Sequence, residues 1–365
     1  MICLSSFAKD LPYTLGSFKR QTEHLQKELS YLGVDIEYDE AARISFLGRR
    51  KYDRYDHFYP GETFDSRLLK WLAGNFDKDE REIAFGIVKD LKFISVYEMK
   101  ELAIRTFENA KSAILKGSIA PSTGDWYNYL ESRNVKMEDE LAKSIFVAVV
   151  DDINFDFFRR YAMRHHSFKK ENFVEYYKRD RDSMQELPAH NRIFLLDQLS
   201  ASGTSAIRYD EKKAEWRGKI PTFLKIWSDN IKNDAIYYCP YILSSVSEKN
   251  LKDRLVQYLR ENSYPRIIVN PTCRIPISSC LANKKKTAVD ESKPVAKLCK
   301  KYYCRFREDE HIEAGGSACY GYGGAGLTLV LQSNCPNDSI YMIWHDYNGW
   351  FPLFPRVSHH TPLRS

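Results

Sequence analysis

The stretch RIFLLDQLSASGTSAIR, residues 192–208, places four apolar residues directly before an acid and follows the acid with hydroxyl side chains around one glycine. The apolar run Ile193 to Leu196 is typical of a buried strand. Small hydroxylated residues between a strand and a helix are typical of a turn that exposes backbone N–H groups at the positive end of the helix. The stretch therefore predicts a strand, an anion-binding turn and a helix.

Three further runs have the same short apolar character: SIFVAVV at 144–150, AIYYCPYIL at 235–243 and RIIVN at 266–270. Helix-length polar stretches separate them. This alternation predicts an α/β fold with a mainly parallel sheet flanked by helices. Ligands of such sheets bind outside the carboxyl ends of the strands, so chemistry is expected directly after each run.

The first part of the chain carries a different pattern. Apolar residues recur every three or four positions in 17–33, 64–76 and 77–91, and Ser95 and Glu98 have the spacing of a capping box at the start of a further helix. We therefore expect a helical N-terminal region over 1–120 and an α/β domain over 121–365, with the Gly-, Ser- and Pro-containing segment 116–126 as the linker.

Composition limits the class of protein. The 365 residues are 43% hydrophobic, which is enough for a substantial core, and no apolar run approaches the roughly 18 residues that span a bilayer. Eight cysteines without dense spacing fit reduced thiols. We expect a cytoplasmic protein without a membrane partner. The net charge of +6 allows phosphate-rich partners without requiring them.

The helical region offers a second kind of partner. The neighbouring helices of 77–91 and 95–115 could form a helix-turn-helix, but the second of them mixes Glu98 and Glu101 with Lys100 and Arg105, so its face is not basic. Docking of a protein or nucleoprotein partner is the favoured interpretation of this region.

The hydroxyl turn is the first candidate site. Ser200, Ser202, Thr204 and Ser205 supply donors, and Gly203 lets the backbone approach an anion closely. An acid beside a phosphate would repel it unless the acid faces a hydroxylated sugar or a magnesium ion, so Asp197 favours a sugar phosphate as ligand. The lack of a Gly-Lys-Ser/Thr ending excludes a Walker loop. A turn that uses Ser and Thr only as helix caps is the structural alternative.

A second pair of acids, Asp151 and Asp152, follows the run at 144–150. Their carboxylates could bind magnesium through a pyrophosphate, or they could cap the following helix. Both interpretations stay open.

The segment FLLDQLSASGTS, residues 194–205, resembles the phosphoribosyl pyrophosphate loop of type I phosphoribosyltransferases. The resemblance implies a phosphoribosyltransferase-like domain over 121–365, in which Asp197 contacts the ribose hydroxyls. The residues implied to wrap the 5-phosphate are Ala201, Ser202, Gly203, Thr204 and Ser205. Gln198 departs from the pattern because it stands where the family has a second acid, and an amide cannot help to stabilise a cationic ribose.

The tail GYGGAGLTLVLQSNCPNDSIYMIWHDYNGWFPLFPR, residues 321–356, is similar to the end of a divergent subgroup of phosphoribosyltransferase-like proteins from prokaryotic conflict systems, including those encoded beside retron reverse transcriptases. The resemblance spans roughly 64–356. It implies an enzyme-like effector or accessory protein of antiphage defence that acts on a nucleotide, a nucleobase or phosphoribosyl pyrophosphate. The alternative is a catalytically impaired module that senses nucleotides.

The tail also contains candidate ligand contacts. Trp344 could stack on a base, and Asn334 and Asn337 could bond its edge. Packing of the indole in the core and turn formation beside Pro336 explain the same residues without a ligand.

Overall fold

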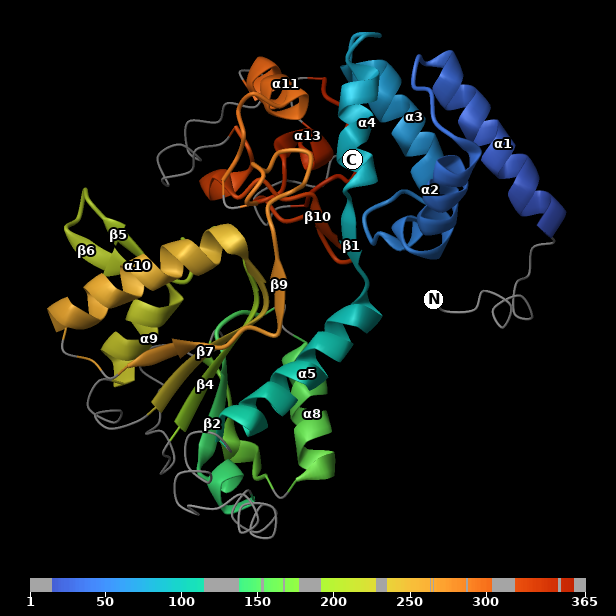
Figure 1. Ribbon diagram of the computed structural model, residues 1–365. Coiled ribbons are helices and arrows are strands. Elements are labelled where there is room, and N and C mark those ends of the chain that lie inside the picture. Colours follow the sequence, from blue (N-terminus) through green and yellow to red (C-terminus); the bar gives the residue numbers. More distant parts are fainter. Residues whose placement is uncertain are drawn as a thin grey trace. The chain divides into compact units, whose positions relative to one another are not determined.

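The computed structural model describes residues 15–114, 138–151, 154–166, 168–176, 192–227, 235–262, 264, 266–286, 288–303, 319–346 and 349–357. The chain forms two compact units (Figure 1). The terminal unit comprises Met1–Ser95, Ser278–Lys284 and Val289–Ser365, and the central unit comprises Val96–Ile277 and Lys285–Ala288. Each unit is described by itself.

The central unit is built on a six-stranded sheet in which every neighbouring pair is parallel. Its order is β3-β2-β4-β7-β8, and β9 also pairs with β7. The strands are β2 (Ser144–Ala148), β3 (Phe173–Glu175), β4 (Arg192–Ser200), β7 (Ala235–Ser244), β8 (Ile267–Val269) and β9 (Cys273–Ile275). The α/β class with a mainly parallel sheet is thereby confirmed.

Helices cover both faces of this sheet (Figure 1). Helices α9 (Lys219–Trp227) and α10 (Ser245–Asn262) pack on one face, where the side chains of Ile193, Leu195 and Tyr238 lie in a hydrophobic core. Helices α5 (Val96–Ile114) and α8 (Phe155–His165) pack on the other face, where Phe107 of α5 and Phe158 of α8 contact the ring of Phe146 in β2. Because both faces are covered, residues 193–196 of β4 and most of β7 are apolar without alternation.

The remaining elements of the central unit are small. Strands β5 (Arg208–Asp210) and β6 (Glu215–Arg217) follow β4 in the sequence, precede α9 and form an antiparallel hairpin. A short 3-10 helix, η4, spans Lys170–Asn172. The linker expected at 116–126 lies outside the described residues.

The terminal unit joins segments from the two ends of the chain. Its first part contains α1 (Leu15–Tyr31), α2 (Tyr38–Arg50), η2 (Tyr52–Arg54), α3 (Phe64–Asn75), α4 (Arg81–Lys89) and β1 (Lys92–Ile94). Its second part contains α11 (Pro294–Tyr303), η7 (Tyr322–Gly324), β10 (Leu329–Leu331) and α13 (Tyr341–Trp344). Strands β1 and β10 pair in parallel, so the C-terminal part of the chain and the N-terminal helices form one unit.

The C-terminal segment 350–356, called the strap below, binds α3 through its backbone groups. Arg67, only 3% exposed, donates from Nη2 to the Pro352 carbonyl (2.7 Å) and from Nε to the Leu353 carbonyl (3.2 Å). Asn75 donates to the Phe351 carbonyl and accepts from the Phe351 N–H. The aromatic and proline pattern of the tail is therefore explained by packing against the N-terminal helices.

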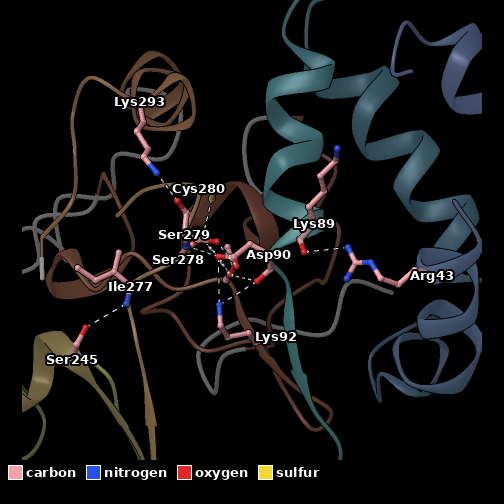
Figure 2. A network of polar contacts seen from close by, with 11 residues as sticks. Arg43, Lys89, Asp90, Lys92, Ser245, Ile277, Ser278, Ser279, Cys280 and Lys293 are labelled. Carbon is pink, nitrogen blue, oxygen red and sulfur yellow. Dashed lines mark hydrogen bonds and ion pairs between the residues drawn. The ribbon is translucent and has the colours of Figure 1, made fainter. Parts of the chain in front are cut away.

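The chain re-enters the terminal unit at Ser278, where Asp90 fixes it (Figure 2). The Asp90 carboxylate accepts hydrogen bonds from Ser278 Oγ (2.5 Å) and from the N–H and Oγ of Ser279 (2.7 Å each), and Lys92 lies 3.4 Å away. Burial would raise the pKa of Asp90, but the hydrogen bonds from Ser278 and Ser279 outweigh it and lower the pKa. Burial raises the pKa of the adjacent Cys280 thiol to about 11, which favours the protonated thiol near neutral pH.

This division differs from the predicted boundary near residue 120. Helix α5 begins at Val96, directly after Ser95 as the pattern predicts, but it belongs to the central unit, and the tail belongs with the N-terminal helices. A helix-turn-helix over 77–115, the less favoured interpretation, does not form, because β1 separates α4 from α5 and pairs with β10. In the described parts of the chain, no helix has the length and apolar character to cross a membrane.

Candidate functional site

The order of the central sheet marks where a ligand would bind. From β2 the chain passes through α8 to β3 on one side, and from β4 it passes through α9 to β7 on the other side. The neighbouring strands β2 and β4 therefore form the switch point of the sheet. Open parallel sheets bind ligands at this point, outside the carboxyl ends of the strands. The segments that follow these two strands contain Asp151 and residues 201–207, respectively.

Strand β4 is longer than predicted. Instead of ending at the acid, it continues through Gln198 to Ser200, because Leu199 and Ser200 stay paired with Ile242 and Leu243 of β7. Asp197 thus lies within the strand, and the loop begins at Ala201. Successive residues of a strand point to opposite faces, so Asp197 shares the face of Leu195 while Gln198 belongs to the α5 and α8 face.

Ser244 at the end of β7 and residues of helix α10 anchor the first half of the loop. Ser244 Oγ donates to the Ala201 carbonyl, and Asn250 Nδ2 donates to the Ser202 carbonyl (2.9 Å). The hydroxyls of Ser200 and Ser247 are 2.7 Å apart. Ser200 is fully buried, so its hydroxyl serves this contact. The loop therefore has a fixed conformation.

Helix α9 anchors the second half. The N–H groups of Lys219 and Ile220 donate to the carbonyls of Ser205 and Ala206, each at 3.0 Å. Gly218 makes this approach possible, since its φ is +119° and a Cβ there would lie 2.7 Å from the Ala206 carbonyl oxygen.

The loop keeps unused backbone donors. Within the described part of the chain, the N–H groups of Ser202, Gly203, Ser205 and Ala206 have no hydrogen-bond partner. Gly203 adopts a left-handed conformation, with φ +77°. A turn that combines a left-handed residue with unbonded N–H groups is the arrangement that binds anions in proteins.

Gly203 also has a structural role that the sequence did not indicate. A Cβ built there would point at α10, 3.1 Å from Ser247 Oγ and 3.5 Å from Leu251 Cγ. The glycine therefore serves the left-handed backbone and the contact with α10. Ala201, Ser202 and Thr204 are buried, whereas Ser205 is exposed.

Asp197 is 1% exposed and held through one oxygen. Its Oδ2 accepts from Lys219 Nζ and from Tyr238 Oη, both at 2.7 Å. Burial, and next the charge of Asp197, raise the pKa of Tyr238 well above its ordinary value. The hydroxyl therefore stays protonated and donates a hydrogen bond to Asp197. The other oxygen, Oδ1, has no hydrogen-bond partner among the residues that the structure describes.

The acids after β2 stand apart from this arrangement. Asp151 is exposed and makes no hydrogen bond or ion pair with another described residue, and Asp152 lies outside the described residues. No group of three or more His, Cys, Asp or Glu side chains that could hold a metal occurs in the described ranges. A single exposed carboxylate still suits magnesium, which usually keeps several waters and shares substrate phosphates.

The three tail candidates lie in the terminal unit, whereas the loop lies in the central unit. Trp344 is 7% exposed, and its Nε1 donates to the Ser339 carbonyl (2.9 Å). The Asn334 side chain binds the N–H and the carbonyl of Val357, and the Asn337 carbonyl accepts from the Tyr322 N–H. Core packing accounts for Trp344, and hydrogen bonds within the tail account for the Asn334 side chain. A ligand contact of the Asn337 side chain stays a prediction.

The sequence interpretation did not single out Lys219, Tyr238 or the segment SSVSEKN at 244–250. The segment carried a usable signal, since its small hydroxylated residues follow the apolar run of β7 as those of the loop follow β4. The contacts of Lys219 and Tyr238 with Asp197 cross 22 and 41 positions, and no local pattern marks them.

The central unit is thus of the α/β class, with a mainly parallel sheet whose switch point is followed by a loop of unbonded backbone N–H groups. The PRTase-CE family model, where PRTase stands for phosphoribosyltransferase, matches residues 68–356, and the chain belongs to this family. The match begins in α3 and ends at the last residue of the strap, so it covers segments of both units. Comparisons with curated proteins and with solved structures gave no match.

Proposed function

We propose that the chain binds a 5-phosphorylated ribose, as in phosphoribosyl pyrophosphate or a nucleotide, at the loop 201–207, and transfers or removes the phosphoribosyl group. The observation that carries the proposal is the set of unbonded N–H groups at Ser202, Gly203, Ser205 and Ala206. They follow the switch-point strand of a phosphoribosyltransferase-like protein.

In this proposal, the loop N–H groups hold the 5-phosphate, and Asp197 Oδ1 accepts a hydrogen bond from a ribose hydroxyl. Asp151 would hold magnesium, which would neutralise the charge of a pyrophosphate leaving group. Reaction at C1 of the sugar passes through a state with oxocarbenium character, so positioning and electrostatics can provide the catalysis without a protein nucleophile.

A second candidate, a nucleotide-sensing module without turnover, is favoured by Gln198. Gln198 stands where the family pattern has a second acid, so the chain provides one negative charge less to stabilise a cationic ribose. Release of pyrophosphate or free base from a panel of nucleotides and phosphoribosyl pyrophosphate, with magnesium, distinguishes the two. Binding without release would support the sensing module, and turnover would exclude it.

Ser205 offers the sharpest test of the phosphate loop, because its side chain is exposed and its N–H is unbonded. Ser205→Glu places a negative charge beside the expected phosphate, and Ser205→Gln has nearly the same shape without the charge. Repulsion between charges a few ångströms apart near a surface should weaken binding of ribose 5-phosphate about tenfold or more in the Glu variant only. Calorimetric titration would contradict the assignment if both variants bound alike.

We further propose a role in antiphage defence, supported by the similarity of the tail to proteins of conflict systems. Expression of the chain with its neighbouring genes, with and without phage, tests this role. Protection that disappears with Ser205→Glu and persists with Ser205→Gln would link this role to the loop 201–207. Equal protection by parent and both variants would separate defence from sugar-phosphate binding.

A further inference from the structure

The carboxylate of Asp197 is fixed from two directions. Lys219 reaches Oδ2 from the first residue of α9, and Tyr238 reaches the same oxygen from the neighbouring strand β7. With one oxygen bound by two donors, rotation of the carboxylate would break both contacts. Oδ1 is left as the acceptor without a partner in the described part of the chain.

The energetics favour this arrangement only if the two donors are present. A carboxylate that is 1% exposed is costly to keep charged unless it is paired and hydrogen-bonded. Lys219 supplies the opposite charge, and its own side chain remains 21% exposed. Tyr238 supplies a neutral donor, because burial keeps its hydroxyl protonated.

We propose that Lys219 and Tyr238 are positioning residues that turn Asp197 Oδ1 toward the sugar, and so set the preference for a ribosyl phosphate over a phosphate without a sugar. The inference rests on the proposed function and deepens it. The loop N–H groups recognise the phosphate, whereas the Lys219–Asp197–Tyr238 contact recognises the hydroxylated ring. Recognition of the phosphate and recognition of the sugar can be tested separately, because they use different groups. Lys219 and Tyr238 contact Asp197 Oδ2, whereas the unbonded donors are backbone N–H groups of the loop.

The test compares the dissociation constants of ribose 5-phosphate and inorganic phosphate by calorimetry. The dissociation constant of phosphate divided by that of ribose 5-phosphate gives a ratio that measures recognition of the sugar. The dissociation constant of phosphate alone measures binding by the loop. A hydrogen bond to a charged acceptor is worth about tenfold or more in affinity, so the parent should prefer ribose 5-phosphate by at least that factor.

Lys219→Met should reduce this ratio about tenfold and leave phosphate affinity within about twofold. Tyr238→Phe, which removes only the hydroxyl, should reduce the ratio by a smaller factor. Lys219→Arg should preserve most of it, because a guanidinium also donates to a carboxylate. Lys225→Met, at an exposed lysine of the same helix, should behave as the parent.

A second comparison links the effect to Asp197. In an Asp197→Asn background, Lys219→Met should lower the ratio no further, because both changes remove the same recognition. A purely structural role would weaken phosphate and ribose 5-phosphate together. Equal loss of both ligands, or an unchanged ratio in Lys219→Met and Tyr238→Phe, would overturn the inference while the loop assignment stands. A parent protein that binds neither ligand would overturn the proposed function and the inference with it.

Discussion

Replacement of Gly203 by alanine should weaken both the central unit and its ligand affinity. Gly203 has a φ of +77°, which costs an L-residue about 1–2 kcal/mol. The new methyl group would also lie 3.1 Å from Ser247 Oγ, so the serine must shift. Loss of the Ser200–Ser247 hydrogen bond would add about 1 kcal/mol. The sum predicts a destabilisation of about 2–3 kcal/mol.

Gly61 provides a matched control. Its φ is +85°, and nothing lies within 4 Å of a Cβ built there. Gly61→Ala should therefore cost only the backbone term, about 1–2 kcal/mol, and leave ligand binding unchanged.

Denaturant unfolding measures the stability change, and calorimetric titration with ribose 5-phosphate measures affinity. We expect at least about tenfold weaker binding in Gly203→Ala, because the displaced loop no longer presents its N–H groups as in the parent. The reasoning is refuted if Gly203→Ala binds as the parent does, or if it costs no more stability than Gly61→Ala.

Two further predictions concern the terminal unit. Burial, and next the charge of Asp53, raise the pKa of Asp65 from 3.8 to about 6. Between these pH values the folded protein holds a proton that the unfolded chain has released. The free energy of unfolding therefore falls as the pH rises from about 4 to about 6. Asp65→Asn should remove that fall and raise the free energy of unfolding by about 1–3 kcal/mol at pH 7 but hardly at pH 4, and an equal gain at both pH values would contradict the assignment. Arg67→Met should cost about 3–5 kcal/mol, because Glu62 and the carbonyls of Pro352 and Leu353 lose their buried partner. Lys70→Met, at an exposed residue of α3 that contacts the Phe351 ring by a cation–π interaction, should cost about 0.5–1 kcal/mol or less in the same unfolding assay.

The central sheet was predictable because its long strands are buried on both faces. The apolar runs at 144–150, 235–243 and 266–270 became β2, β7 and β8, and the run before Asp197 became β4. Strands of three residues, such as β3 and β9, leave too short a pattern to be recognised.

The division into units could not be read from local patterns. Arg67, Trp71 and Asn75 bind carbonyls more than 270 positions away, and such contacts have no signature in the neighbouring sequence. The predicted linker position depended on composition alone, whereas pairing of β1 with β10 decides which helices belong together.

The candidate site, like the fold, was predictable only where its residues are neighbours in the sequence. The residue types mark the loop from Ala201 to Ser205, because small hydroxylated residues around one glycine after a buried strand are typical of a turn. Its binding of a phosphate stays a prediction. The two donors on Asp197 come from another strand and another helix, and only the fold brings them to the acid. Trp344 shows the opposite case, in which a residue type common in ligand sites is used for packing.

The proposed function requires that unbonded backbone N–H groups of the loop hold the 5-phosphate of a ribosyl ligand. Binding can be followed by titrating the isotope-labelled chain with ribose 5-phosphate and recording the amide resonances of Ser202, Gly203, Ser205 and Ala206. These amides should show large, saturable shifts, because each N–H gains an acceptor that it lacks in the free protein. Saturable binding that shifts other amides and leaves these four unchanged would contradict the proposed function.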